Sequence, residues 1–519
     1  MIAQAMCAVQ TSTCFRTHPP ATAATDAGPA NRPRVGPRAV LLGLIAAVPY
    51  LAVAGSMRCD YPQTLAAYHI FAADALLHGQ LHLRDAVLGP HFAREEQRAR
   101  ETAERIQRSR GEQWPAEKLE SYLRTSIFHD LAIHDGKFYA YWAPLTPVVM
   151  MPWVAAFGPG VSDRLINALL GAVNVALAYW MFRNVDRSGL RRLSEACCVA
   201  LTVLFAFGTV HFWLSCGGCV WFSVQITTLT PLLLSIIALT GRRNTPAMYA
   251  LSGALFGASV LGRNTVLLLG AFFLIVIWIR RRGEGDRAAR RVAVRVMAFG
   301  LPVIAAGLVQ MAYNYGRFGD AFESGLAIQM RTGGEPRFRP NLDRYGLFNP
   351  VYLTRNLYYY FWNWHFPTRQ GQTTFDPWGN SMFLVTPPLL YLFMVWRRRD
   401  AFTLALLCGV IPLLAALLLC CATGYVQFGN RYLLDGMPLL LLLVATGMNG
   451  RVSLIGGVLI IAAVAMNTFG TLRFFPLQTA PAARWLTLPR LTVGTLVLIL
   501  TWAAIWSWSL RAHKRAEWI

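Results

Sequence analysis

The chain has 519 residues, of which 55% are hydrophobic and 14% are charged, and its formal net charge is +22. Soluble domains carry about 25% charged residues. Long apolar runs recur along most of this chain, so the composition excludes an ordinary soluble enzyme and predicts a polytopic, all-α integral membrane protein. The positive charge favours arginine clusters beside membrane spans, in contact with anionic membrane lipids, over binding of nucleic acid.

In chain order, residues 1–37 are polar and lack periodicity, which predicts a disordered cytoplasmic tail. Twelve apolar runs then predict about twelve transmembrane helices. These runs are 38–55, 164–182, 196–214, 221–240, 246–262, 264–280, 293–313, 381–396, 401–421, 431–447, 452–470 and 491–510. The last run belongs to a C-terminal region, 471–519, that is expected to end in a short basic cytoplasmic tail.

A thirteenth apolar piece, 143–158, is predicted not to cross the membrane. It offers fourteen residues from Pro144 to Phe157 and contains three prolines, whereas a spanning helix needs about 17 to 25 residues. If it stays at the surface as a re-entrant or juxtamembrane helix, nearly every arginine-dense short loop falls on one side; loop 471–490 disagrees mildly. Both termini are then expected to be cytoplasmic, in a bacterial inner membrane.

This topology predicts two long extracytoplasmic loops, 56–142 and 314–380. The first contains a charged stretch, 92–124, which predicts a solvated helix with internal ion pairs. The second contains the aromatic run YYYFWNWHF at 358–366. That run is equally typical of an aromatic belt at the bilayer surface and of a platform for a sugar or a lipid headgroup.

Acidic residues at the predicted outer face are the first candidates for chemistry, because the sequence contains no soluble catalytic motif. Asp60 follows the first span, although an Asp there can also simply cap a helix. Asp130 and Asp135 precede the juxtamembrane piece, and Asp135-Gly136 can form a turn. His129 and His134 lie beside these aspartates, so a divalent metal is an open alternative.

These features together resemble the GT-C membrane glycosyltransferases, in particular the aminoarabinose-transferase and protein-mannosyltransferase group. The resemblance covers most of 38–470 and depends on CDYPQTLAAYHIFAADALLHGQ, GKFYAYWAPLTPVVMMPW, AFGPGVSDRLINALLGA, NYGRFGDAFESG and YVQFGNRYLLDGMPLLLLL. Asp60-Tyr61 replaces the usual Asp-Glu pair, and Trp142-Ala143-Pro144 replaces Lys-Pro-Pro. The resemblance implies a GT-C-like catalytic region over 38–470 that uses a polyprenyl-phosphate-linked sugar donor.

Transfer of such a sugar needs a base for the acceptor hydroxyl and cations for the phosphate leaving group. Asp60 is expected to be the general base, because a carboxylate at a low-dielectric boundary becomes more basic. Arginine binds phosphate in a bidentate manner, so Arg263 and Arg431 are expected to hold the phosphate. Arg431 has an alternative, a local ion pair with Asp435 four residues on. The remaining candidate substrate-binding residues are Asp130, Asp135, Lys137, Tyr141, Arg317 and Asp435.

The expected function is therefore transfer of a sugar to an envelope glycan, lipid or protein at the periplasmic face. The sequence leaves two alternatives open. A lipid or glycan transporter would place ionisable residues in the middle of the membrane and would show a two-fold repeat. A non-catalytic envelope protein would tolerate replacement of Asp60 and Arg431.

Overall fold

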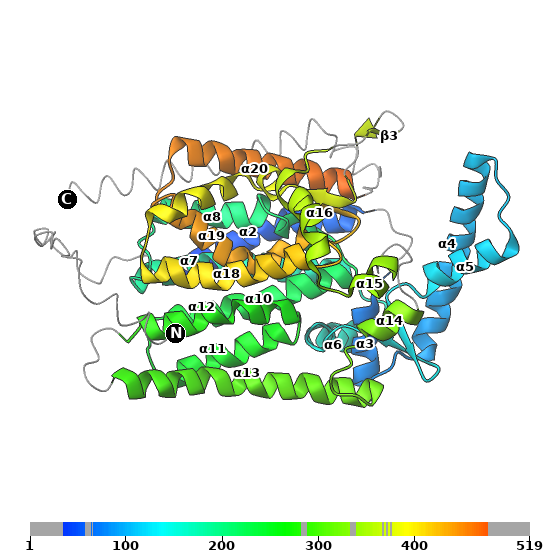
Figure 1. The fold of residues 1–519 in the computed structure, drawn as a ribbon, viewed down its shortest axis with the longest axis horizontal. Coiled ribbons are helices and arrows are strands. Elements are labelled where there is room, and N and C mark those ends of the chain that lie inside the picture. Colours follow the sequence, from blue (N-terminus) through cyan, green and yellow to red (C-terminus); the bar gives the residue numbers. More distant parts are fainter. Residues whose placement is uncertain are drawn as a thin grey trace, which may run out of the picture. The chain divides into compact units, whose positions relative to one another are not determined.

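The structure is a computed structural model of the whole chain, and Figure 1 shows its fold. It describes residues 35–57, 64, 66–281, 288–332, 339–365, 368–369, 372–373 and 376–475. The chain divides into Met1–Val35 and one compact unit, Gly36–Ile519. The fold described below is that of the second unit.

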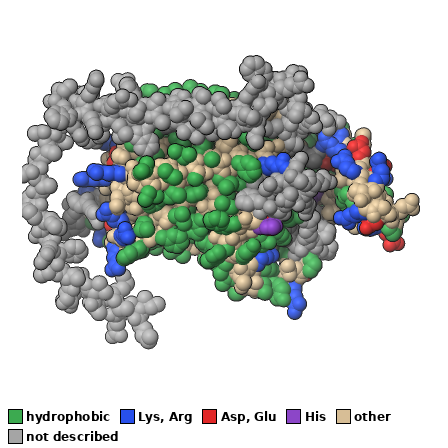
Figure 2. Space-filling view, turned by 90° about the horizontal axis from the view of Figure 1, so that it is seen from above, with side chains coloured by type: hydrophobic (Ala, Val, Ile, Leu, Met, Phe, Trp, Pro, Cys, Tyr) green, Lys and Arg blue, Asp and Glu red, His purple; other side chains and the backbone are tan. Residues whose placement is uncertain are grey.

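Among the described residues, six helices are long and apolar enough to cross a membrane by their length and composition. They are α2 (Val35–Ser56), α7 (Asp163–Arg187), α10 (Val220–Thr240), α13 (Ala288–Phe318), α18 (Ala401–Leu419) and α20 (Leu454–Phe474). Large apolar side chains on α13 face outward: Met297 is 61% exposed and Leu301 is 59% exposed. Figure 2 shows hydrophobic side chains over the middle of one face and Lys and Arg toward its two ends, as expected for a membrane protein.

Five further predicted spans form helices that are shorter or broken into consecutive pieces. Residues 196–214 form α8 (Glu195–Phe207) and most of α9 (His211–Cys216), and 246–262 forms α11 (Pro246–Val260). The other three form η2 (Asn264–Leu269) with α12 (Gly270–Ile279), α17 (Met382–Val385) with η6 (Pro387–Arg397), and η7 (Arg431–Gly436) with α19 (Met437–Gly447). The run 491–510 lies outside the described residues, so the count of twelve spans stays a prediction.

The arginine-rich loops meet at one end of the bundle, which we call the basic end. Arg191 Nη2 lies 2.7 Å from Asp400 Oδ2, and Arg398 Nη2 donates to Asn449 Oδ1 at 2.7 Å. Arg280 Nη1 donates to the carbonyl oxygen of Leu239 at 2.8 Å. The loops that the sequence assigned to one side of the membrane are therefore neighbours in the fold.

The opposite end, which we call the site end, carries the shorter elements (Figure 1). The apolar piece 143–158 forms α6 (Leu145–Phe157), a thirteen-residue helix that packs against α3 (Tyr68–Leu77) and α10. The other elements of this end are α14 (Leu326–Thr332), α15 (Arg339–Tyr345), η4 (Pro350–Tyr352), α16 (Leu353–Leu357) and η5 (Tyr358–Trp362). A helix of thirteen residues is too short to cross a bilayer alone, as expected for this piece.

The charged stretch 92–124 forms a helical hairpin and not the single helix that the sequence predicted. Its arms are α4 (Asp85–Arg110) and α5 (Ala116–Ile127). Gly111 ends α4 in the left-handed region at φ 64°, and Pro115 precedes α5. The expected ion pairs are present at helical spacing, for example Arg100 to Glu96 at 2.7 Å.

In the described part of the chain, three small two-stranded sheets accompany the helices. Strands β1 (Leu131–His134) and β2 (Lys137–Ala140) form an antiparallel hairpin whose register pairs Leu131 with Ala140. Strands β3 (Thr368–Arg369) and β4 (Gln372–Thr373) form a second antiparallel pair. Strands β5 (Trp378–Asn380) and β6 (Gln427–Gly429) are parallel, so the end of the second long loop is joined to the segment that precedes Arg431.

Candidate functional site

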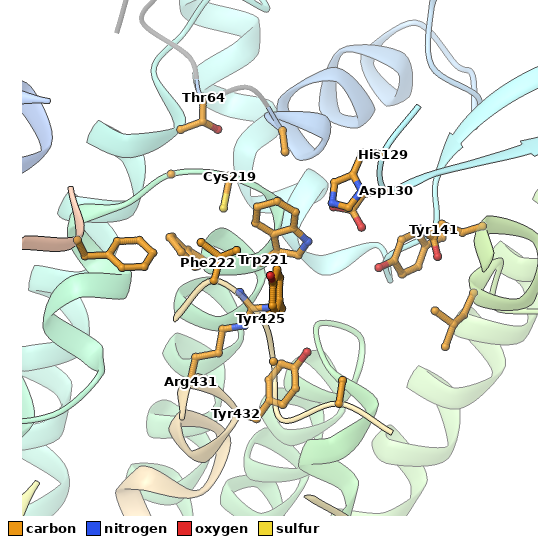
Figure 3. Close-up of a pocket in the computed structure, with 18 of the residues that line it drawn as sticks. Thr64, His129, Asp130, Tyr141, Cys219, Trp221, Phe222, Tyr425, Arg431 and Tyr432 are labelled. Atoms are coloured by element: carbon orange, nitrogen blue, oxygen red, sulfur yellow. The ribbon is translucent and has the colours of Figure 1, made fainter. Parts of the chain in front are cut away.

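A cavity of about 640 Å³ lies at the site end and collects segments far apart in sequence (Figure 3). Its walls come from the end of α2, the hairpin β1–β2 with its flanks, the starts of α7 and α10, the segment 420–432 and the end of α20. Aromatic side chains from several of these segments line the walls. They are Tyr141, Trp221, Phe222, Tyr425, Tyr432, Phe474 and Phe475.

Asp163 joins two of these segments, and sequence reasoning gave it no role. Its Oδ2 accepts hydrogen bonds from Thr64 Oγ1 at 2.6 Å and from the backbone N–H of Cys219 at 2.7 Å. The carboxylate is fully buried in the first turn of α7, where a negative charge is stabilised by the helix dipole. Gly218 is required beside it, because a Cβ there would lie 2.6 Å from Asp163 Oδ2.

Asp60, the expected general base, lies outside the described residues. The described residues on either side of it, Met57 and Thr64, both line the cavity. The only signal for Asp163 in the sequence was its position directly after Ser162, which caps α7 by accepting from the N–H of Leu165.

Asp130 and its neighbour His129 both line the cavity. Asp130 is 6% exposed and has φ 62°, in the left-handed region that Asp adopts more readily than most residues. His129 Nε2 lies 3.1 Å from Asp130 Oδ2. Tyr141 lines the same cavity, and burial, followed by the Asp130 charge, raises its pKa well above the usual value.

Asp135 and Lys137 lie at the tip of the β-hairpin and do not line the cavity. Asp135 and Gly136 form the turn with φ 48° and 70°, which is the alternative that the sequence offered for this pair. The Asp135 side chain is 85% exposed and lies 3.6 Å from His134 Nε2. Of Asp130 and Asp135, the two described acidic candidates beside this hairpin, Asp130 lines the cavity and Asp135 does not.

Arg431 enters the cavity from the start of η7 and is 6% exposed. Its guanidinium carbon lies 5.9 Å from the ring centres of Trp221 and Phe222 and 5.3 Å from that of Tyr432. Within the described residues its side chain makes no hydrogen bond and no ion pair, and its buried Nε has no partner. Figure 3 shows the guanidinium directed toward Trp221 and Tyr425.

Arg263 and Asp435 form an ion pair with each other. Arg263 Nε lies 2.8 Å from Asp435 Oδ2, which also accepts from Thr265 Oγ1 at 2.6 Å. The local Arg431–Asp435 pair that the sequence allowed is absent from the described structure. Neither Arg263 nor Asp435 lines the cavity, so the two predicted phosphate-binding arginines have different environments.

Arg317 contacts the backbone of the segment that contributes Tyr141 to the cavity. At the end of α13 its Nη1 donates to the carbonyl oxygens of Ala140 at 2.9 Å and Trp142 at 3.3 Å. These two residues flank Tyr141. Arg317 therefore fixes the chain on both sides of a cavity residue without lining the cavity itself.

The aromatic run 358–366 does not contribute to this cavity in its described part, 358–365. Trp362 and Trp364 are more than half exposed, whereas Tyr360 is buried. Among the described residues, no group of three or more His, Cys, Asp and Glu side chains is placed to hold a metal ion. The cavity cysteines Cys219, Cys420 and Cys421 are all free thiols.

Comparisons with known proteins found similarity to a solved structure. No protein family and no curated protein matches the sequence. The chain is similar to the oligosaccharyltransferase of Archaeoglobus fulgidus in the apo form, with 12% identity and a TM-score of 0.47. The match covers 86% of this chain and 57% of the archaeal chain. With so distant a likeness, an assignment of function depends on the cavity itself.

Proposed function

We propose that this chain is a GT-C-type membrane glycosyltransferase that binds a polyprenyl-phosphate-linked sugar in the cavity at the site end. The observation that carries the proposal is the side chain of Arg431. It is a buried cation that opens onto a cavity and has no carboxylate partner among the described residues. Burial of an unpaired charge costs free energy, so a site of this kind is explained by an anionic ligand.

The composition of the cavity favours a lipid-linked phosphate over a small free anion. Arg431 has two further arginines with it in the lining, Arg98 and Arg164. Phe222, Phe474 and Phe475 supply apolar walls beside them, which suits a ligand with both a phosphate and a hydrocarbon part. Trp221 and Tyr432 present ring faces on which a sugar can stack.

The finer parts of the proposal follow from the sequence. The site end faces the periplasm and the basic end faces the cytoplasm, with twelve spans, both termini cytoplasmic, and the chain in a bacterial inner membrane. The acceptor is an envelope glycan, lipid or protein. Asp60 is one candidate for the base that takes the acceptor's proton, and no metal is assigned.

Binding of undecaprenyl phosphate to the purified protein in lipid nanodiscs tests the proposal. Loss of a hydrogen bond to a charged group costs about 1.5–3 kcal/mol, so Arg431→Gln is expected to weaken binding by about 10- to 100-fold. Arg431→Lys keeps the charge but loses the bidentate geometry, and an intermediate effect is expected. Arg110→Gln, at the exposed end of α4, is the matched control.

A second measurement separates transfer from transport. A transferase releases free polyprenyl phosphate when it is given donor and acceptor, whereas a transporter leaves the donor intact. If Arg431→Gln binds undecaprenyl phosphate as tightly as the wild type does, the phosphate site is wrong. If wild type binds but releases no polyprenyl phosphate from native envelope lipids, transfer is wrong.

A further inference from the structure

The cavity contains an imidazole and a carboxylate in direct contact, and neither is used by the phosphate site. His129 and Asp130 project from the turn between α5 and β1 (Figure 3). The backbone N–H of Leu131 donates to the carbonyl oxygen of Phe128 across this turn at 3.2 Å. That turn holds Asp130 at its positive φ and places its carboxylate against His129.

The carboxylate can support proton transfer to the imidazole. Asp130 Oδ2 lies 3.1 Å from His129 Nε2 as an ion-pair contact, and a negative charge at this distance stabilises the imidazolium that forms when Nδ1 accepts a proton. A carboxylate beside a histidine has this electrostatic role in hydrolases that use a histidine as the general base.

The imidazole also lies close to the phosphate site. The Trp221 ring centre is 5.8 Å from the ring centre of His129 and 5.9 Å from the guanidinium carbon of Arg431. Tyr141 lies close enough to both groups for their charges to affect it. The Asp130 charge raises the pKa of Tyr141 and the Arg431 charge lowers it. A donor whose phosphate contacts Arg431 can therefore place its sugar in the part of the cavity that His129 lines.

We infer that His129 is the general base of the proposed transfer and that Asp130 is its positioning residue. This assignment rests on the proposed function. The acceptor oxygen forms a bond to the anomeric carbon of the sugar, and the bond from that carbon to the phosphate oxygen breaks. The acceptor's hydroxyl proton moves to His129 Nδ1, and the polyprenyl phosphate leaves with the bonding electrons. The acceptor is accordingly a hydroxyl-bearing molecule.

Several other groups face the imidazole across the cavity and bear on any pH dependence. The charged ones are Asp130, Arg98, Arg164 and Arg431, and Tyr141, Tyr425 and Tyr432 add phenols. Burial raises the pKa of Cys219, and the hydrogen bond with Cys420 raises that of Cys421. The thiol of Cys420 is the competitor to exclude, because its hydrogen bond with Cys421 lowers its pKa.

The test is the rate at which nanodiscs with native envelope lipids release polyprenyl phosphate between pH 5 and 8, measured by mass spectrometry. This product is common to all donors of the class, so the sugar need not be known. A general base must be unprotonated to act, so the wild-type rate is expected to fall on acidification. His129→Gln is expected to lower the rate at pH 8 by at least about 100-fold and to abolish the fall at low pH.

Two further variants and one binding measurement accompany this rate assay. Asp130→Asn is expected to lower the rate because it removes the negative charge that stabilises the imidazolium. Cys420→Ser is expected to keep the wild-type pH profile. His129→Gln is expected to bind undecaprenyl phosphate normally, which shows that the variant is folded and that the phosphate site is separate.

Three results would overturn the assignment. One is a His129→Gln enzyme with the wild-type rate and pH profile. Another is a rate that no longer falls at low pH in Asp60→Asn but still falls in His129→Gln. That result would make Asp60 the base. The third is absence of product from the wild type at every pH, which would overturn the proposed function and the base together.

Discussion

At the scale of single residues, Arg263 and Arg431 show how two arginines at the same end of a bundle come to differ. The spacing of Arg431 and Asp435 permits an ion pair in an α-helix. The structure places both in η7, a 3₁₀-helix, in which residues three apart share a face and residues four apart do not. Asp435 therefore reaches Arg263 and Thr265, and Arg431 is left to the cavity.

The Arg263–Asp435 pair is expected to be structural. Removing one partner of a buried pair leaves an uncompensated charge and costs about 3–5 kcal/mol, whereas replacing both with apolar residues costs little. Asp435→Leu and Arg263→Met are each expected to lower the apparent melting temperature in nanodiscs, and the double variant is expected to recover most of the loss. Weaker binding of undecaprenyl phosphate by Arg263→Met at unchanged melting temperature would instead place Arg263 in the substrate site.

His91, in α4, is expected to make the site end sensitive to acid. Burial lowers its pKa from 6.5 to about 4, with a smaller contribution from the charges of Arg94 and Arg98. The unfolded chain binds the proton first as the pH falls, so stability is full above about pH 6.5 and is lost between about pH 6.5 and 4, by about 3 kcal/mol in total. The ring packs among Tyr68, Phe71 and Phe92.

His91→Phe keeps this aromatic packing and removes the titration. Its apparent melting temperature is expected to fall less than that of the wild type between pH 7 and pH 5. Equal losses in the two proteins would show that another group controls the acid response.

At the scale of elements, the apolar runs predicted where helices lie. They did not predict the positions at which a helix is interrupted or changes to a 3₁₀-helix. The six long spans follow from composition alone. The division of 196–214 into α8 and α9, and the 3₁₀ starts at Asn264 and Arg431, depend on tertiary contacts that no local pattern encodes. The hairpin α4–α5 was predictable in part, because Gly111 and Pro115 are ordinary end and start signals for helices.

Helices α11 and α13 are expected to depend on a close approach at glycine. A Cβ at Gly253 would lie 2.0 Å from the carbonyl oxygen of Phe299, whereas Gly300 on α13 has open space. Small residues allow membrane helices to pack backbone to backbone. Gly253→Ala is expected to destabilise the protein by about 1–3 kcal/mol, and Gly300→Ala is expected to be neutral or slightly stabilising.

Thermal unfolding of the two alanine variants in the same nanodiscs measures the difference. The two substitutions add the same methyl group to the same kind of helix. The contribution of helix propensity therefore cancels in the difference between their melting temperatures, and the contribution of packing remains. Equal melting temperatures would mean that α11 and α13 separate at little cost.

At the scale of the whole molecule, charge predicted the two ends of the bundle but not the cavity. The number of arginines in each short loop was enough to predict which loops lie together at the basic end. The cavity draws on chain positions from Met57 to Phe475, and a single sequence carries no signal for contacts at such separations. Asp163 was not predicted for this reason. Its role depends on hydrogen bonds from Thr64 and Cys219, which are distant from it in the chain and form no motif with it.

The two ends are expected to face opposite sides of the membrane, because the described loops of the basic end contain an excess of arginine. Asp135 marks the site end, at the exposed tip of the β-hairpin, and Arg242 is exposed between α10 and α11 at the basic end. In intact spheroplasts a membrane-impermeant maleimide is expected to label Asp135→Cys above the parent protein and to label Arg242→Cys only after lysis. The parent corrects for native thiols, which in the described residues are buried or half-buried. Labelling of Arg242→Cys in intact spheroplasts would place the cavity on the cytoplasmic side, where a donor would not need to be flipped across the membrane before transfer.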